Sequence, residues 1–97
     1  MILTAEQQKK YDDFYESTHH NQFLDAKTEL LVGLAAALAA GCIPCMKYYL
    51  FKAKEAGIKR GEISEVIAKV MAVTAGQKRL QAEEVMQKYQ IDLDGYA

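Results

Sequence analysis

The chain has 97 residues, of which 51% are hydrophobic, and its 12 Lys and Arg residues nearly balance 13 Asp and Glu residues. This length predicts a single domain over residues 1–97. The balanced charge argues against a protein that binds nucleic acid or an anionic membrane surface. The hydrophobic fraction is high for a chain of this size, which suggests that some apolar surface is buried between subunits.

Neither a targeting signal nor a membrane span is expected. Residues 1–6 lack the charged and then apolar pattern of a signal peptide, so we expect a cytoplasmic protein. The longest apolar stretch, Leu30–Ala40, is interrupted by Gly33 and is too short to cross a bilayer, which predicts a buried helix.

Helical spacing of apolar residues recurs along the chain, and no stretch keeps the alternation of a strand for long. Thr4 and Gln7 have the spacing of a capping box at the start of a first helix, which ends before a turn at residues 18–22. Asp25 is a suitable N-cap for a second helix, which runs to about Ala40 and is ended by Gly41.

Three further helices are expected after Gly41. The third begins around Cys42 and runs to Ala56, with Gly57 as its stop signal. The fourth has apolar residues at i, i+3, i+4 and i+7 and should end at Gly76. A fifth is marked by Ala82, Val85, Met86 and Tyr89. The sequence therefore predicts an all-α bundle of about five helices.

Two cysteines, Cys42 and Cys45, frame the sequence Cys-Ile-Pro-Cys at the expected start of the third helix. Residues i and i+3 lie on one side of a helix, within reach of a disulfide. The unpaired N–H groups and partial positive charge of the helix start stabilise a thiolate, and Pro44 suits the first turn. In a cytoplasmic protein this pattern predicts a redox-active dithiol.

Two other interpretations of the cysteines remain open. They could form half of a zinc or copper site, for which His19, His20 or a second subunit would have to supply the other ligands. They could also be packed as small hydrophobic residues in a structural oligomer.

The residues around the dithiol resemble the carboxymuconolactone decarboxylase-like superfamily, and within it the alkylhydroperoxidase D-like branch. The similarity covers roughly residues 24–76 and includes Asp25–Ala35, Gly41–Cys45, Lys54–Ile58 and Glu62–Ile67. The resemblance implies an all-helical fold that assembles as a homotrimer or homohexamer. It also implies a thiol-dependent peroxidase or disulfide reductase that needs no haem, flavin or other cofactor, with an unidentified thiol reductant or disulfide partner protein.

The resemblance also implies roles for individual residues. Peroxidases of this branch have Cys-x-x-Cys-x-x-x-His with a glutamate twelve residues before the first cysteine. By analogy, Cys45 attacks the peroxide and Cys42 resolves the sulfenic acid. This chain has Tyr49 in place of the histidine and Leu30 at the glutamate position, with Glu29 one residue away.

These departures shape the expected activity. Tyr49 is a poor base at neutral pH but a good hydrogen-bond donor, so we expect weak peroxidase activity or mainly disulfide exchange. Either His19 or His20 could supply a substitute base if the first helix packs over the dithiol, although a solvated helix end explains the pair equally well. Packing alone also accounts for Tyr49. Decarboxylation of a lactone, as in the superfamily name, is the less favoured activity.

Overall fold

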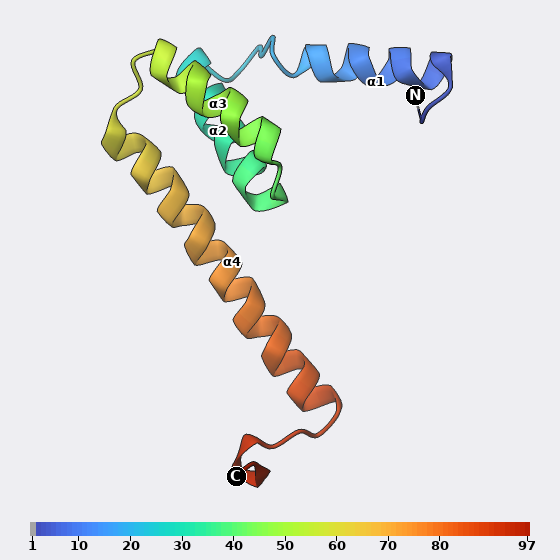
Figure 1. The fold of residues 1–97 in the computed structure, drawn as a ribbon, viewed down its shortest axis with the longest axis vertical. Coiled ribbons are helices and arrows are strands. Elements are labelled where there is room, and N and C mark those ends of the chain that lie inside the picture. Colours follow the sequence, from blue (N-terminus) through green and yellow to red (C-terminus); the bar gives the residue numbers. More distant parts are fainter. Residues whose placement is uncertain (1) are drawn as a thin grey trace.

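The computed structural model of the protein describes residues 2–97, which form four α-helices and one short 3₁₀-helix (Figure 1). The α-helices are α1 (Ala5–Ser17), α2 (Ala26–Ala40), α3 (Ile43–Glu55) and α4 (Arg60–Lys88), and the 3₁₀-helix η1 spans Leu93–Gly95. No strand occurs in this part of the chain, so the all-α prediction is confirmed.

The first two helices begin at the predicted caps. The Thr4 hydroxyl accepts the Gln7 backbone N–H at 3.2 Å, and the Gln7 side chain accepts the Thr4 N–H at 3.1 Å. The Asp25 carboxylate accepts the Thr28 N–H at 2.7 Å, and this hydrogen bond holds the pKa of Asp25 below its usual value. These bonds satisfy backbone donors that the first turn of a helix leaves without partners.

The predicted break at Gly76 is wrong, because α4 is one continuous helix of 29 residues. The expected fifth helix is therefore the C-terminal part of α4. Gly41 and Gly57 have positive φ angles of 69° and 72°, which turn the chain out of a helix, whereas Gly76 keeps a helical backbone. A glycine inside a helix costs about 1 kcal/mol relative to alanine, too little to break a segment whose neighbours favour helix.

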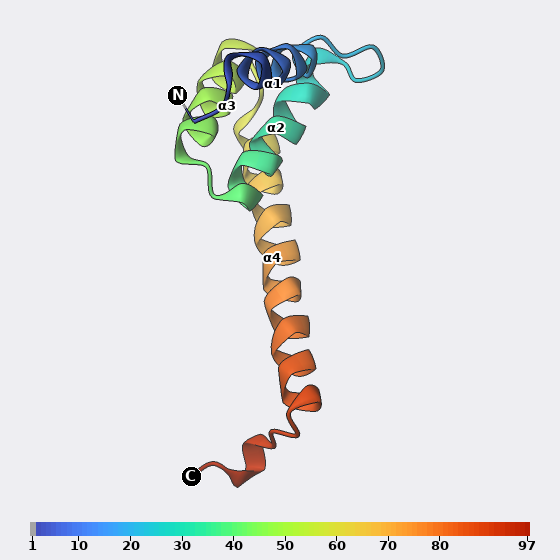
Figure 2. The ribbon, with the colours of Figure 1, turned by 90° about the vertical axis from the view of Figure 1, so that its right-hand side faces the viewer.

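Helix α2 is the centre of the structure, since it packs against both α3 and α4 (Figure 2). Leu34 and Ala37 of α2 and Ala53 of α3 are the buried hydrophobic residues of this three-helix arrangement. Small alanine side chains allow the two helices to approach closely. An ion pair between Lys27 of α2 and Glu62 of α4 joins the starts of these helices and lowers the pKa of the Glu62 carboxyl.

One copy of the chain is extended. Its radius of gyration is 19.0 Å, whereas a compact domain of this length has a value of about 12.5 Å. Helix α1 projects to one side of the α2–α3 pair, and the C-terminal part of α4 continues away from it (Figures 1 and 2). The exposed area is 8214 Å², about 2,600 Å² more than a compact monomer of this mass exposes.

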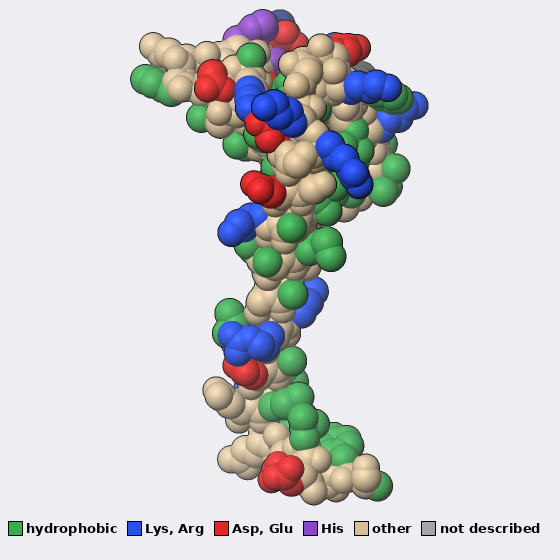
Figure 3. Space-filling model, turned by 90° about the vertical axis from the view of Figure 1, so that its left-hand side faces the viewer, with side chains coloured by type: hydrophobic (Ala, Val, Ile, Leu, Met, Phe, Trp, Pro, Cys, Tyr) green, Lys and Arg blue, Asp and Glu red, His purple; other side chains and the backbone are tan. Residues whose placement is uncertain are grey.

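Much of this exposed area is apolar. Figure 3 shows hydrophobic side chains along α4 and gathered near the C-terminal end of the chain. Met71 and Val73 in the middle of α4 are each 66% exposed, and Tyr11 and Phe14 of α1 are also exposed. None of the helices in residues 2–97 combines the length and the apolar character needed to cross a lipid bilayer.

Candidate functional site

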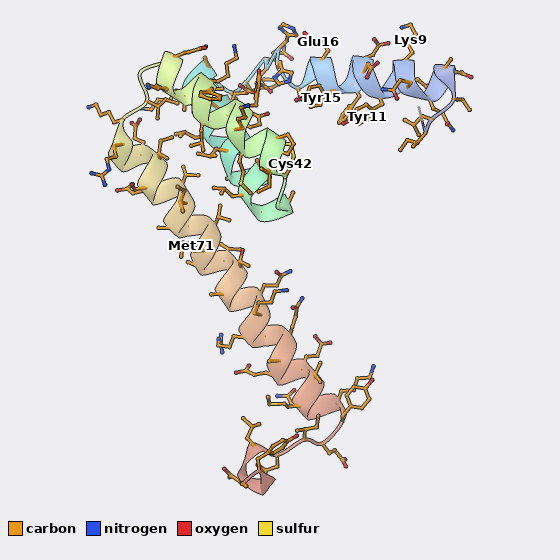
Figure 4. All side chains as sticks on the ribbon, viewed as in Figure 1. Lys9, Tyr11, Tyr15, Glu16, Cys42 and Met71 are labelled. Carbon is orange, nitrogen blue, oxygen red and sulfur yellow. A yellow bond between two sulfur atoms is a disulfide. The ribbon has the colours of Figure 1, made fainter. Side chains whose placement is uncertain are left out.

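The cysteine pair lies where α2 ends and α3 begins, as the sequence predicts (Figure 4). Gly41 ends α2 in the left-handed conformation, and the Cys42 N–H then donates to the Ala37 carbonyl at 3.0 Å. Cys42 is the N-cap of α3, with Pro44 in its first turn. The chain thus passes from one helix to the next through two residues, Gly41 and Cys42.

Cys42 and Cys45 are joined by a disulfide, with their Cα atoms 5.2 Å apart. The Cys45 backbone N–H donates to the Cys42 sulfur at 3.3 Å. Both residues are half-buried, so the pair is partly accessible to solvent. In the reduced protein the same N–H and the helix dipole would stabilise a thiolate at Cys42.

Tyr49 follows Cys45 by one turn of α3, on the same side of the helix. Its ring lies directly against Gly33 of α2, in the space that a side chain would otherwise fill. Burial raises the pKa of the Tyr49 phenol, and the charge of Glu29 raises it further. The hydroxyl therefore keeps its proton at neutral pH and serves as a donor, in line with its expected chemistry.

Glu29 lies in the first turns of α2, and its carboxylate is 3.7 Å from Nδ1 of His19. The side chains of both residues are only 19% exposed. The one-residue shift from the family spacing therefore does not turn Glu29 out to solvent. It faces the loop between α1 and α2, close enough to Tyr49 for its charge to act on the phenol.

The two histidines differ sharply. The His19 ring lies in a row of aromatic rings. Its centroid is 4.9 Å from the ring centroid of Tyr15 and 6.0 Å from that of Tyr48. The Tyr48 ring centroid is in turn 5.0 Å from that of Tyr49. His20 instead contacts Glu16 at 2.9 Å, and its side chain is 73% exposed. Only His19 is therefore turned towards the residues around the dithiol helix.

Two small pockets adjoin each other beside these residues. One, of about 190 Å³, is lined in part by Gly33, Tyr49 and Glu29. The other, of about 250 Å³, is lined in part by His19 and Glu29. Asn21, Leu24 and Glu29 line both pockets, whereas the two cysteines line neither.

The chemistry available to this site is that of sulfur and of proton exchange. Within residues 2–97 of one copy, no group of three or more His, Cys, Asp and Glu side chains is arranged to hold a metal ion. A zinc or copper site built on the dithiol would therefore need ligands from another copy.

The sequence identified Cys42, Cys45, Tyr49 and Glu29 as candidate site residues. The structure places Tyr49 beside Glu29 and places the two cysteines together, one turn from Tyr49. The sequence analysis missed two features. The Tyr49 ring packs directly on Gly33, and His19 rather than His20 contacts Glu29. The glycine interrupting an apolar helix was the available signal for the first.

Comparison with known proteins identifies a family and a similar solved structure. The sequence model of the carboxymuconolactone decarboxylase family matches residues 5–88. The crystal structure of a protein from Methanobacterium thermoautotrophicum is similar, with a TM-score of 0.74 and 28% sequence identity. The match covers 82% of this chain and 90% of that protein. The search of curated proteins found no match.

The packing of the Tyr49 ring on Gly33 can be tested with glycine substitutions. In Gly33→Ala the new methyl group would overlap the Tyr49 ring, and we expect the free energy of unfolding to fall by about 1–3 kcal/mol. Gly61→Ala, in the first turn of α4 where nothing lies within 4 Å, should leave it unchanged or raise it by up to about 1 kcal/mol, because alanine favours helix over glycine. Urea unfolding at one fixed protein concentration measures both, and equal values would mean that Tyr49 does not pack on Gly33.

Proposed function

The chain belongs to the carboxymuconolactone decarboxylase family, and we propose that within it the protein is a thiol-dependent oxidoreductase that cycles between the Cys42–Cys45 dithiol and disulfide. The observation that carries this proposal is the half-exposed disulfide at the N-terminus of α3, with the Cys45 N–H directed at the Cys42 sulfur. This environment favours the thiolate, which is the reactive form of cysteine.

The proposed reaction transfers two electrons from the dithiol to an acceptor. With a peroxide, the thiolate of Cys45 attacks one oxygen, the O–O bond breaks, and the leaving oxygen is protonated to water or an alcohol. Cys42 then attacks the sulfenic acid, releasing water and forming the disulfide. With a partner disulfide, Cys42 attacks to form a mixed disulfide, which Cys45 resolves. A thiol reductant returns two electrons and two protons.

Whether a peroxide or a partner disulfide is reduced faster depends on Tyr49, the residue one turn after Cys45. Tyr49 keeps its proton at neutral pH, because burial and the Glu29 charge raise its pKa. It can donate a hydrogen bond to a peroxide oxygen but does not itself accept the thiol proton. We therefore propose slow peroxide reduction, or mainly exchange with a protein disulfide, in a reducing compartment such as the cytoplasm.

We propose in addition that the protein assembles with copies of itself. A single copy exposes about 2,600 Å² beyond the value for a compact monomer of this mass, an excess of the size that obligate subunit interfaces cover. The exposed apolar side chains of α1 and α4 supply suitable surface. A homotrimer or homohexamer is the assembly that the family resemblance implies.

Cysteine variants test the redox proposal. Cys42→Ser and Cys45→Ser should each reduce thiol-dependent consumption of hydrogen peroxide, or reduction of a model disulfide, at least about 100-fold, because neither variant can close the disulfide. Far-UV circular dichroism checks that the helices remain. Turnover equal to that of the parent in both variants would refute the proposal, and turnover of a carboxylated lactone by the double serine variant would favour the decarboxylase instead.

The assembly proposal predicts a particle of three or six times the chain mass of 10.9 kDa, measured by light scattering after size exclusion. Met71→Glu places a charge on an exposed apolar site of α4 and should shift the protein to smaller species, since burying a charge without a partner is costly. Gln77→Glu on the same helix is the matched control. A parent protein that stays at 10.9 kDa at micromolar concentration would contradict the proposal.

A further inference from the structure

Helix α3 has one packed side and one exposed side. On the packed side it lies on α2, with the Tyr49 ring against Gly33. On the exposed side, apolar residues and lysines recur at i, i+4, i+7, i+8 and i+11, which is the spacing of a single helix face. We call this side the outer face of α3, and its members are Ile43, Lys47, Leu50, Phe51 and Lys54.

The apolar residues of the outer face are large and uncovered. Ile43 is 70% exposed, Leu50 43% and Phe51 60%. Apolar side chains that are exposed singly are common on proteins, but three along one helix face form a patch. An exposed apolar patch rimmed by polar residues marks a surface that another molecule contacts.

The lysines make the outer face positive, although the whole chain has a net charge of only −1. Helix α3 has three lysines and one acidic residue, Glu55, which pairs with Lys52. Within residues 2–97, neither Lys47 nor Lys54 takes part in an ion pair. The Lys47 ammonium instead lies 5.8 Å from the centre of the Phe51 ring. Two cations without an acidic neighbour favour a partner with acidic side chains.

The mixture of lysines and apolar residues differs from a permanent subunit contact. Obligate interfaces resemble the core of a domain, and lysine is depleted from the centre of interfaces. A helix of 13 residues is about 20 Å long. This length suits the small interfaces of transient redox encounters, which bury less than about 1,200 Å². The outer face therefore fits a partner that binds and leaves.

The outer face begins at the disulfide. Ile43 lies between Cys42 and Cys45 in the sequence, and Lys47 follows Cys45 by two residues. Figure 4 shows Cys42 at the end of α3. Because both cysteines are half-buried, a protein that brings a thiol to the disulfide also contacts the exposed residues beside it.

We propose that the outer face of α3 is the docking surface for the protein that reduces the Cys42–Cys45 disulfide, and that this partner carries its dithiol beside acidic and apolar side chains. The proposal rests on the thiol-dependent function proposed above and specifies the reductant by its charge. The surfaces of α1 and α4 that we assign to assembly lie on other helices.

Docking leads to a balanced thiol–disulfide exchange. A thiolate of the partner attacks the Cys42 sulfur, the bond to Cys45 breaks, and Cys45 leaves as a thiolate. The second thiolate of the partner then attacks the mixed disulfide and releases Cys42. The partner loses two electrons and becomes a disulfide, while its two thiol protons pass to the reduced cysteine pair.

Two dithiol peptides of opposite charge serve as probes. Both contain Cys-Gly-Gly-Cys beside a leucine, with glutamates around it in the acidic peptide and lysines in the basic one. Each peptide, in excess, reduces the disulfide of the protein, and the new protein thiols are alkylated and counted by mass spectrometry over time. The peptides differ in their own reactivity, so the ratio of the acidic to the basic rate is compared between protein variants.

The double variant with Lys47→Glu and Lys54→Glu should lower this ratio at least about 10-fold at low ionic strength, at the lower end of the effects of electrostatic steering. The difference should shrink in about 1 M salt, where the Debye length is about 3 Å. The matched control carries Lys78→Glu and Lys88→Glu, which make the same change of charge in the C-terminal part of α4. Its ratio should equal that of the parent.

Phe51→Ser tests the apolar part of the surface. This variant should be reduced by the acidic peptide at least about fivefold more slowly than the parent, since a docked partner covers the ring. Dithiothreitol needs no docking surface and should reduce the variant and the parent at the same rate. Equal rates with the acidic peptide would contradict a contact on Phe51. Unfolding midpoints confirm that all variants are folded.

The outcomes separate the docking surface from the redox proposal. Equal rate ratios in the parent and in the Lys47→Glu, Lys54→Glu variant would overturn the docking surface, even if the parent reduces peroxides or disulfides. A smaller particle for this variant in light scattering would show a contact between copies instead, and would also overturn it. A ratio that depends on these lysines in a protein without thiol-dependent turnover would support the docking surface and retire the proposed oxidoreductase.

Discussion

The two-residue turn between α2 and α3 is the constraint on which the rest of the site depends. Gly41 adopts a φ of 69°, which L-residues with a side chain rarely adopt. In this turn the Cys42 N–H donates to the Ala37 carbonyl near the end of α2. The Cys42 sulfur accepts the Cys45 N–H in the first turn of α3. One local geometry therefore ends a helix, starts the next, and fixes a dithiol at a positive helix terminus.

The same turn sets how α3 lies on α2. Ala53 of α3 is buried, and α3 packs on α2, in which Leu34 and Ala37 are also buried. In this arrangement the ring of Tyr49 reaches Gly33, one helical turn beyond Glu29. A backbone feature at the turn thus determines which α2 residues are near the phenol. The packing of α3 on α2 therefore brings Tyr49, one turn after Cys45, close to Glu29.

Features with local causes could be predicted from the sequence. The caps at Thr4 and Asp25, the stop at Gly41 and the position of Cys42 at a helix start all follow from bonds within a few residues, and the structure confirms them. Gly76 was misread because a glycine ends a helix only where the chain adopts positive φ, a property that the residue type permits without requiring.

Features that depend on distant contacts could not be predicted. The sequence offered Glu29 at a shifted spacing and two adjacent histidines, but the orientation of each depends on how the loop after α1 folds onto α2. The large apolar fraction led us to expect surface buried between subunits, and one copy does leave many large apolar side chains exposed, because a short chain with one central helix pair buries few side chains. Our proposal that other copies of the chain cover this surface concerns assembly, which the sequence of one copy does not specify.

Activation of the dithiol by the start of α3 can be measured by an ultraviolet titration of the thiolates in the reduced protein and in each single-cysteine variant. We expect at least one thiol to have a pKa below the free-thiol value of about 8.5, and we expect it to be Cys42, because the Cys45 N–H donates to the Cys42 sulfur. Thiol pKa values at or above that reference in both variants would contradict it, and the structural or metal-binding interpretation of the cysteines would then replace the redox one.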